Sequence, residues 1–396
     1  MIQKTIQRND TFFLIACTFV LLSIIIEALS VSHHISYFFN TIALIFFLKL
    51  VNLKNIYFLN NYIKSIYVIL FLYNCWLIFR LLSNNKGYSI ESYLFHPYML
   101  QSILIFCLLL VDGSLIFTLY KRLSKILFIS IILMIFSIKA GIAVLSVYIY
   151  LYMIFINYTL KKKIKSCLIL MYIITFVYVQ SIIFDNRFIL MFLILFGLGI
   201  IVVRYFPTLK KMLLFLYIVF PFVFVILLYG YNFSLLNVSN YISASNNSIL
   251  MTDTRTFLFY DVKETLESNN SLLFGEGLNG KILTTLNSEV DQSIDRLGKR
   301  RFVECNFLDL ARRGGIIYVM LYAFLMIISS CNLIQAKSLT LQYISFFIAT
   351  SFFCSLIGVT HSMSYETILL FLLISLSFDK GITSKTEVEI FQQLSS

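Results

Sequence analysis

Residues 126–158 read ILFISIILMIFSIKAGIAVLSVYIYLYMIFINY, an apolar run whose one charged residue is Lys139. As a single straight helix the run would be about 50 Å long. The hydrocarbon core of a bilayer is about 30 Å thick and is crossed by about 20 helical residues. Lys139 and Gly141 lie at the middle of the run, where a charge and a residue of low helix propensity favour a break. The run therefore predicts two membrane-spanning helices joined near residue 139.

Long apolar runs recur along the chain of 396 residues. Hydrophobic residues make up 60% of it and charged residues 13%, whereas soluble domains carry about 25% charged residues. Period-2 alternation is absent, which excludes a membrane β-barrel. The sequence therefore predicts an all-α polytopic membrane protein with about twelve transmembrane helices. The expected spans are 11–29, 35–53, 62–82, 98–118, 122–138, 140–158, 166–184, 187–204, 211–231, 313–334, 341–358 and 363–380.

The basic residues predict how these spans are oriented. Most Lys and Arg residues of the short loops fall on one side, and the short loops of the other side hold Arg80, Lys86, Lys139 and Arg187. Positive charge in short loops marks the cytoplasmic side, while long loops are translocated largely regardless of charge. Both termini are therefore expected to be cytoplasmic, and the long segment between the ninth and tenth spans is expected to be external.

The spans divide the chain into three parts of unequal size. Residues 1–231 form an N-terminal membrane region of nine spans, residues 232–312 form the large external loop with amphipathic helices, and residues 313–396 form three spans and a short cytoplasmic tail. No internal repeat is visible. This asymmetry disfavours a transporter built from inverted repeats, which breaks its helices at matching places in two halves.

Charge and cysteine content exclude several other classes of protein. The net charge of +12 comes from residues scattered over short loops, not from the continuous basic patch that binds nucleic acid. The seven cysteines lack CxxC spacing, and no Asp-x-Asp pair occurs. Neither a disulfide framework, nor a zinc site, nor the metal ligands of a sugar-nucleotide transferase are indicated. No cofactor is expected.

Polar residues concentrate in the external loop, where residues 252–267 predict an amphipathic helix. Leu258, Val262 and Leu266 recur at four-residue spacing, after a Thr or Asp that could cap the helix. Arg255 falls in the first turn, where positive charge opposes the helix dipole. A bound anion would explain this arginine, and an ordinary surface position is the alternative.

Residues 275–280 spell GEGLNG, which matches the letters GxGxxG. The dinucleotide-binding interpretation is rejected, because that fingerprint works as a strand-to-helix turn inside a βαβ unit. Gly275 and Gly277 instead predict a turn whose backbone approaches a ligand or a span closely.

Residues 300–317 lead from the loop into the tenth span. Glu304 lies one helical turn from Arg300 and Arg301, and Asp309 lies one turn before Arg312 and Arg313. This spacing places carboxylates among arginines at the membrane surface. Ordinary helix ion pairs, Glu304 with Arg300 and Asp309 with Arg313, are the structural alternative.

The order of these features along the chain, and the side of the membrane on which they are expected, resemble those of the superfamily of O-antigen polymerases and O-antigen ligases. Residues 137–143 (SIKAGIA) resemble the family's Ser-Arg-small-residue helix start, with Lys139 at or beside the arginine. Arg255 resembles the family's loop arginine, and the turn at Gly275 and Gly277 follows it. Residues 304–309 (ECNFLD) with Gly315 resemble the acidic-aromatic-acidic signature of Wzy-type polymerases. Ligases usually carry a His-Asn pair near Glu304, and its absence favours a polymerase.

The resemblance implies a GT-C-like helical fold in a bacterial inner membrane. It also implies a polymerase that transfers undecaprenyl-pyrophosphate-linked oligosaccharide units onto one another at the periplasmic face, with a chain-length regulator protein as a further partner. Glu304 and Arg255 are the expected catalytic residues, as general base and as ligand of the pyrophosphate. The expected substrate-binding residues are Lys139, Gly277, Arg300, Asp309, Arg312 and Arg313.

Three other functions stay open at this point. A ligase would move finished glycan onto lipid A core. A flippase for lipid-linked oligosaccharides would use the same cations to bind pyrophosphate during transport. A sensor or receptor is disfavoured because no signalling domain follows Lys380.

Overall fold

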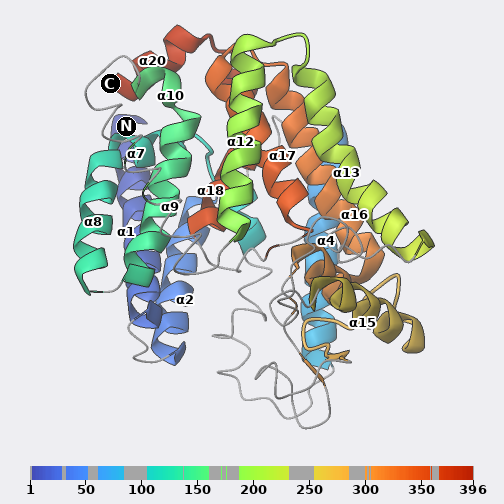
Figure 1. Cartoon of the computed structure of the whole chain (residues 1–396). Coiled ribbons are helices and arrows are strands. Elements are labelled where there is room, and N and C mark those ends of the chain that lie inside the picture. The colour runs from blue at the N-terminus through green and yellow to red at the C-terminus, as the bar shows by residue number, and fades with distance from the viewer. Residues whose placement is uncertain are drawn as a thin grey trace.

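The computed structural model of the chain describes residues 2–28, 33–51, 61–83, 105–136, 138–159, 171, 175, 187–231, 254–284, 299–300, 303, 305–356, 358 and 365–395. Helices dominate this part of the chain (Figure 1). In chain order the elements are α1 (Ile2–Ala28), α2 (His33–Leu50), α4 (Asn61–Ser83), the 3-10 helix η1 (Ile105–Leu110), α7 (Leu115–Lys121), α8 (Leu123–Phe136), α9 (Ile138–Ile154), α10 (Ile156–Thr159), α12 (Arg187–Tyr205), α13 (Lys210–Tyr231), α15 (Thr254–Ser268), β1 (Ile282–Leu283), β2 (Lys299–Arg300), α16 (Asn306–Ile334), α17 (Leu339–Cys354), α18 (Tyr365–Leu376), α19 (Lys380–Thr383) and α20 (Glu387–Ser395).

Four helices in the described part are long and apolar enough to cross a membrane. Their apolar segments are Asn9–Ile26 in α1, Lys64–Ser83 in α4, Lys210–Leu227 in α13 and Asn306–Ile334 in α16. Shorter apolar helices accompany them, among them α8, α9, α12, α17 and α18. The predicted helical class is thus confirmed, apart from the two-residue strands β1 and β2. The four long apolar helices are compatible with the predicted membrane protein, and the count of twelve spans stays a prediction.

The apolar run 126–158 is divided as its sequence predicts. Helix α8 ends at Phe136 and α9 begins at Ile138, and the two pack side by side (Figure 1). A Cβ atom on Gly141 would lie 2.7 Å from the backbone nitrogen of Met134. Glycine at this position therefore lets the two helices approach each other directly after the turn.

The fourth expected span, 98–118, is wrong in its described part. In place of one helix, η1 ends at Leu110, a turn follows at Asp112 and Gly113, and α7 begins at Leu115. The Asp112 side chain accepts a hydrogen bond from the Ser114 amide at 2.9 Å, which stabilises the turn. A Cβ on Gly113 would lie 2.4 Å from the Leu376 nitrogen, so the chain breaks where it touches α18.

Other boundaries differ less from expectation. The seventh expected span, 166–184, lies almost wholly outside the described residues. The tenth begins at Asn306, seven residues before the expected start at 313. The tail after α19 holds the unpredicted helix α20, whose Glu387 accepts hydrogen bonds from the Thr340 amide at 3.1 Å and hydroxyl at 2.7 Å. This contact ties the C-terminal end to the start of α17.

Both chain ends lie at one end of the helix bundle, and α15 lies at the other (Figure 1). The labelled helices nearest to the chain ends are α7, α10 and α20 (Figure 1).

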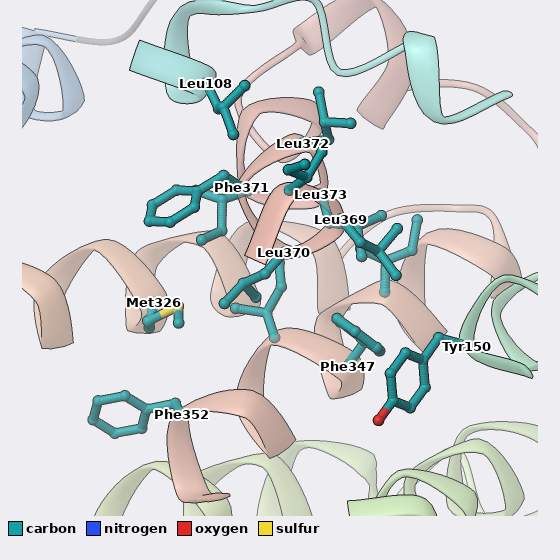
Figure 2. Close-up of a cluster of buried hydrophobic side chains, with 14 of the residues drawn as sticks. Leu108, Tyr150, Met326, Phe347, Phe352, Leu369, Leu370, Phe371, Leu372 and Leu373 are labelled. Carbon is teal, nitrogen blue, oxygen red and sulfur yellow. The ribbon is translucent and has the colours of Figure 1, made fainter. Parts of the chain in front are cut away.

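The core is centred on α16, α17 and α18. Figure 2 shows Leu369 to Leu373 of α18 packed among Phe347 and Phe352 of α17, with Met326, Tyr150 and Leu108 contributed by α16, α9 and η1. By contrast, α4 and α13 expose large apolar side chains, such as Phe79 at 70% and Ile226 at 64%. Exposure of this kind is expected where the surrounding solvent is lipid hydrocarbon.

Candidate functional site

Helix α16 is interrupted at a pair of glycines where the large loop meets the membrane region. Gly315 has φ +67° and ψ −169°, a backbone conformation that essentially only glycine adopts. The helix is thereby divided into residues 306–314 and residues 316–334. Carbonyl groups before the break and amide groups after it lose their intrahelical partners. These groups must find other partners because the site is buried.

Residues 271–277 of the large loop supply those partners. Carbonyl oxygens of Leu272 and Leu273 accept from the amides of Ile316 and Ile317 at 3.0 and 3.4 Å. In return, the Glu276 amide donates to the Arg312 carbonyl at 2.6 Å. The Gly277 amide donates to the Arg313 carbonyl at 3.0 Å. The loop therefore completes the hydrogen bonding of the broken helix, as buried backbone in or near a membrane requires.

The glycines of the GEGLNG segment permit this close contact. A Cβ atom on Gly275 would lie 2.6 Å from the backbone nitrogens of Gly314 and Gly315. Gly275 and Gly277 have φ of +66° and +84°, which side chains disfavour. The prediction that this turn brings backbone close to a span is confirmed.

Helix α4 also holds residues 271–277 of the loop in place. Arg80 donates through Nη1 to the carbonyls of Phe274 and Gly275, at 3.0 and 2.7 Å. Its guanidinium group lies over the Trp76 ring at 5.4 Å, and that ring contacts the Phe274 ring. Tyr73, one turn earlier than Trp76, donates to the Gly314 carbonyl. The sequence predicts only a loop cation at Arg80 and does not indicate this role, although Arg80 is one of few cations in the short loops of its side, which is a usable signal.

Asp309, Arg312 and Arg313 form a buried ionic cluster in the first part of α16. Arg312 is fully buried, and its Nε and Nη2 donate to one Asp309 oxygen at 3.0 and 2.7 Å. Its Nη1 donates to the Gly280 carbonyl at 2.6 Å. Arg313 pairs with the other Asp309 oxygen. The ion pair between Asp309 and Arg313, predicted as the alternative to a substrate-binding role, is thus present. Arg312 likewise binds groups of the protein, namely Asp309 and the Gly280 carbonyl.

Burial changes the expected importance of this cluster. The spacing alone suggested a pair at the membrane surface, where an i,i+4 pair contributes about 0.3 to 0.5 kcal/mol. The Asp309 side chain is instead 9% exposed and the Arg312 side chain 1%. A charge that loses its partner there stays desolvated, which costs several kcal/mol.

The predicted amphipathic helix of the loop is present as α15, residues 254–268. Leu258, Val262 and Leu266, the three residues at four-residue spacing, are all buried. The helix is fixed to its neighbours by a ring contact between Phe259 and Phe224 of α13. A hydrogen bond of 3.2 Å from the Leu283 amide to the Thr265 hydroxyl joins it to β1.

The remaining predicted site residues are only partly described. Arg300 is 2% exposed and lies in β2, which pairs antiparallel with β1. Arg255 and Lys139 lie in the first turns of α15 and α9, and the structure describes their backbone. Glu304 lies outside the described residues. The structure therefore brings Gly277, Asp309, Arg312 and Arg313 together, and the predicted catalytic roles stay predictions.

The comparisons with known proteins add no relative: the chain matches no protein-family model, no curated protein and no solved structure. The site must therefore be judged by its own chemistry.

Replacing Arg80 by methionine should loosen the inserted loop. The change keeps most of the side-chain length and removes both hydrogen bonds to the loop carbonyls, and hydrogen bonds to charged groups contribute about 1.5 to 3 kcal/mol. Hydrogen–deuterium exchange of a peptide covering residues 271–280 is therefore expected to accelerate about tenfold or more. Arg204→Met, at the other end of the bundle, is the control because Arg204 is exposed and its bond to Asn157 is 3.5 Å long. Equal loop exchange in the two variants would contradict the assigned role.

Proposed function

We propose that this protein is a surface-polysaccharide polymerase, a membrane glycosyltransferase that joins oligosaccharide units carried on undecaprenyl pyrophosphate. The observation that supports the proposal is the interrupted α16. At the end of the bundle away from both termini, a loop packed against the membrane region gathers Arg80, Arg312 and Arg313 around one broken helix. Such a rigid, partly desolvated basic site suits a pyrophosphate that gains negative charge as it leaves.

The proposed reaction is a metal-independent displacement at an anomeric carbon. The bond between that carbon and the pyrophosphate oxygen of one lipid-linked chain breaks. A hydroxyl oxygen of a sugar on the second chain forms the new glycosidic bond and gives its proton to Glu304. Undecaprenyl pyrophosphate departs with the bonding electrons, and Arg255 stabilises its charge through the two-pronged geometry of a guanidinium group.

Within this proposal the described residues have mainly positioning roles. Asp309 and Arg312 hold the Gly280 end of the loop, and Arg80 holds its Gly275 end. Lys139, Arg300 and Arg313 are the proposed further contacts to anionic substrate. We assign the protein to a bacterial inner membrane, with this site at the periplasmic face and a chain-length regulator as a partner.

Loss of the gene tests the proposed function. A polymerase mutant should display surface glycan with single repeat units, because flipping and ligation continue without it. A ligase mutant would instead accumulate long polymer on the lipid carrier. The structure also gives some support to a flippase, because an interrupted helix is a recurrent binding device in transporters. A flippase mutant would lack surface glycan and retain unpolymerised units on the cytoplasmic side.

Glu304→Gln should lower turnover by about 100-fold or more, which is the lower part of the range for lost general acid–base catalysis. Glutamine is nearly isosteric but cannot accept the proton of a sugar hydroxyl at neutral pH. Purified variant and wild-type protein are compared for binding of lipid-linked donor, which should be unchanged, and for polymer formed per unit time. Turnover close to wild type in a folded variant would remove Glu304 from the mechanism.

The proposed orientation predicts which positions an impermeant thiol reagent reaches. In a protein without native cysteines, Asn269→Cys at the end of α15 should be labelled in intact spheroplasts and Ser384→Cys should not, since both residues are exposed at opposite ends of the bundle. Ser271, in the same loop, is unsuitable for labelling because it is buried and hydrogen-bonded to Glu276. The reverse labelling pattern would overturn the orientation.

A further inference from the structure

A groove lies between α1, α8 and α9 at the end of the bundle that carries the chain termini. Its volume is about 390 Å³, within the range of pockets that bind small molecules. The walls are largely apolar, with Leu14 and Leu21 on α1, Ile126 and Ile129 on α8, and Val144 and Val147 on α9. Figure 1 shows these three helices side by side at the edge of the bundle, away from α15 and the interrupted α16.

Two cations, Arg122 and Lys125, also line this groove. Both side chains are exposed. Among the interactions of the described residues, neither side chain takes part in a hydrogen bond or ion pair. Asp10, on the same end of α1, accepts a hydrogen bond from Thr118 at 2.9 Å. The cations are thus available to a ligand with negative charge.

The two cations stand at the junction of two helices. Helix α7 ends at Lys121 and α8 begins at Leu123, so the negative end of one helix dipole meets the positive end of the other. The amides of Lys125 and Ile126 donate to the Arg122 carbonyl at 2.9 and 3.0 Å. An anionic group at this place would therefore be stabilised by the two cationic side chains and not by a helix end.

The length of the groove matches part of one bilayer leaflet. Along α1 its lining runs from Leu14 to Leu21, about 10 Å at 1.5 Å per residue. Half of a hydrocarbon core is about 15 Å. Beside the groove, α8 exposes Phe128 at 65% and Ile131 at 44%, which indicates that this face of the bundle meets lipid. An acyl chain fits such a surface without displacing a protein contact.

We propose that this groove binds an anionic phospholipid, with its phosphate at Arg122 and Lys125 and an acyl chain along α1 and α9. Charge complementarity favours this occupant. The helix ends around it are rich in lysine and arginine, the pattern of the membrane side whose leaflet attracts basic residues through anionic lipid. The proposal is independent of the polymerase function, because the groove lies at the other end of the bundle from the interrupted helix.

The test measures lipid binding to the purified full-length chain by native mass spectrometry, with dioleoyl phosphatidylglycerol and dioleoyl phosphatidylcholine as probes. Wild type should prefer the anionic lipid. Arg122→Gln/Lys125→Gln should bind phosphatidylglycerol about 30-fold more weakly, since each basic residue near an anionic surface contributes about 1 kcal/mol and 1.4 kcal/mol is tenfold. Lys211→Gln/Lys380→Gln, which removes two charges from the same end but away from the groove, should bind as wild type does. Equal affinities of the two double variants would overturn the site.

A third variant separates a lipid from free phosphate. Thr18 is exposed and lines the groove on α1, so Thr18→Phe should fill the groove while the cations stay in place. Phosphatidylglycerol binding should fall about tenfold or more in this variant, with the melting temperature in detergent unchanged. Unchanged lipid binding, or displacement of the lipid by inorganic phosphate alone, would show that the acyl groove does not contribute and would overturn the proposal.

Discussion

Gly315→Ala is expected to detach the loop of residues 271–277 from α16 and to destabilise the protein by about 3 kcal/mol or more. The native φ of +67° with ψ of −169° is nearly inaccessible to alanine, at a cost of about 1 to 3 kcal/mol. In addition, the new Cβ would lie 2.2 Å from the Leu273 carbonyl oxygen and 2.5 Å from the Phe274 nitrogen. The loop has to move away, and the hydrogen bonds from Ile316 and Ile317 to its carbonyls are then lost.

Two measurements follow the effect of Gly315→Ala. Thermal unfolding in detergent should shift to lower temperature, and limited proteolysis should cut residues 271–280 faster than in wild type. Gly197→Ala is the matched control: Gly197 lies inside α12, and its nearest neighbour to an added Cβ would be the Met153 side chain at 3.9 Å. That change should be neutral or stabilise by up to about 1 kcal/mol through helix propensity. Similar stability of the two variants would show that the break in α16 is not required.

Asp309→Asn is expected to cost about 3 to 5 kcal/mol, the penalty for removing one partner of a buried ion pair. Asparagine keeps the shape of the side chain and removes the charge that neutralises both Arg312 and Arg313. Two guanidinium groups then remain in a site from which water is largely excluded. The loss appears in the free energy of unfolding and not only in turnover, which separates this residue from Glu304.

The control for Asp309→Asn is Glu267→Gln in α15. Glu267 pairs with Lys263 at 3.9 Å, and their side chains are 54% and 39% exposed, so its loss should cost less than about 0.5 kcal/mol. A double variant, Asp309→Asn/Arg313→Gln, should lose less stability than the sum of the two single changes, because it removes one of the stranded charges. Additive losses, or a loss as small as in Glu267→Gln, would contradict a buried ionic cluster.

Local patterns predicted several elements correctly. The division of the run 126–158 follows from its length and from Lys139 and Gly141, because one helix of that length exceeds the bilayer thickness. The buried face of α15 follows from apolar residues four apart, because helix periodicity alone places them on one side. The Asp309–Arg313 pair follows in the same way from i,i+4 spacing. Each of these predictions depends on residues within a few helical turns of one another.

Other features could not be predicted because they depend on contacts between distant segments. Asp112 and Gly113 lie in an apolar run that looks continuous, and the break occurs because Gly113 packs against Leu376 of α18. The role of Arg80 depends on carbonyl groups almost two hundred positions later in the chain. The hydropathy of a segment indicates whether it suits lipid or water. It carries no information about which distant backbone groups form hydrogen bonds with each other.

The sequence by itself determined the helical class, the long apolar helices that suit a membrane, and the concentration of polar residues between the ninth and tenth expected spans. Only the tertiary structure decided that α16 is interrupted and that residues 271–277 complete it. A helix normally satisfies its own backbone through bonds between residues four apart, so its formation can be inferred locally. Because Gly315 is not helical, the backbone groups on both sides of it need hydrogen-bond partners from another part of the chain, and residues 271–277 provide them. The same loop covers Arg312, which donates to the Gly280 carbonyl and is buried together with Asp309.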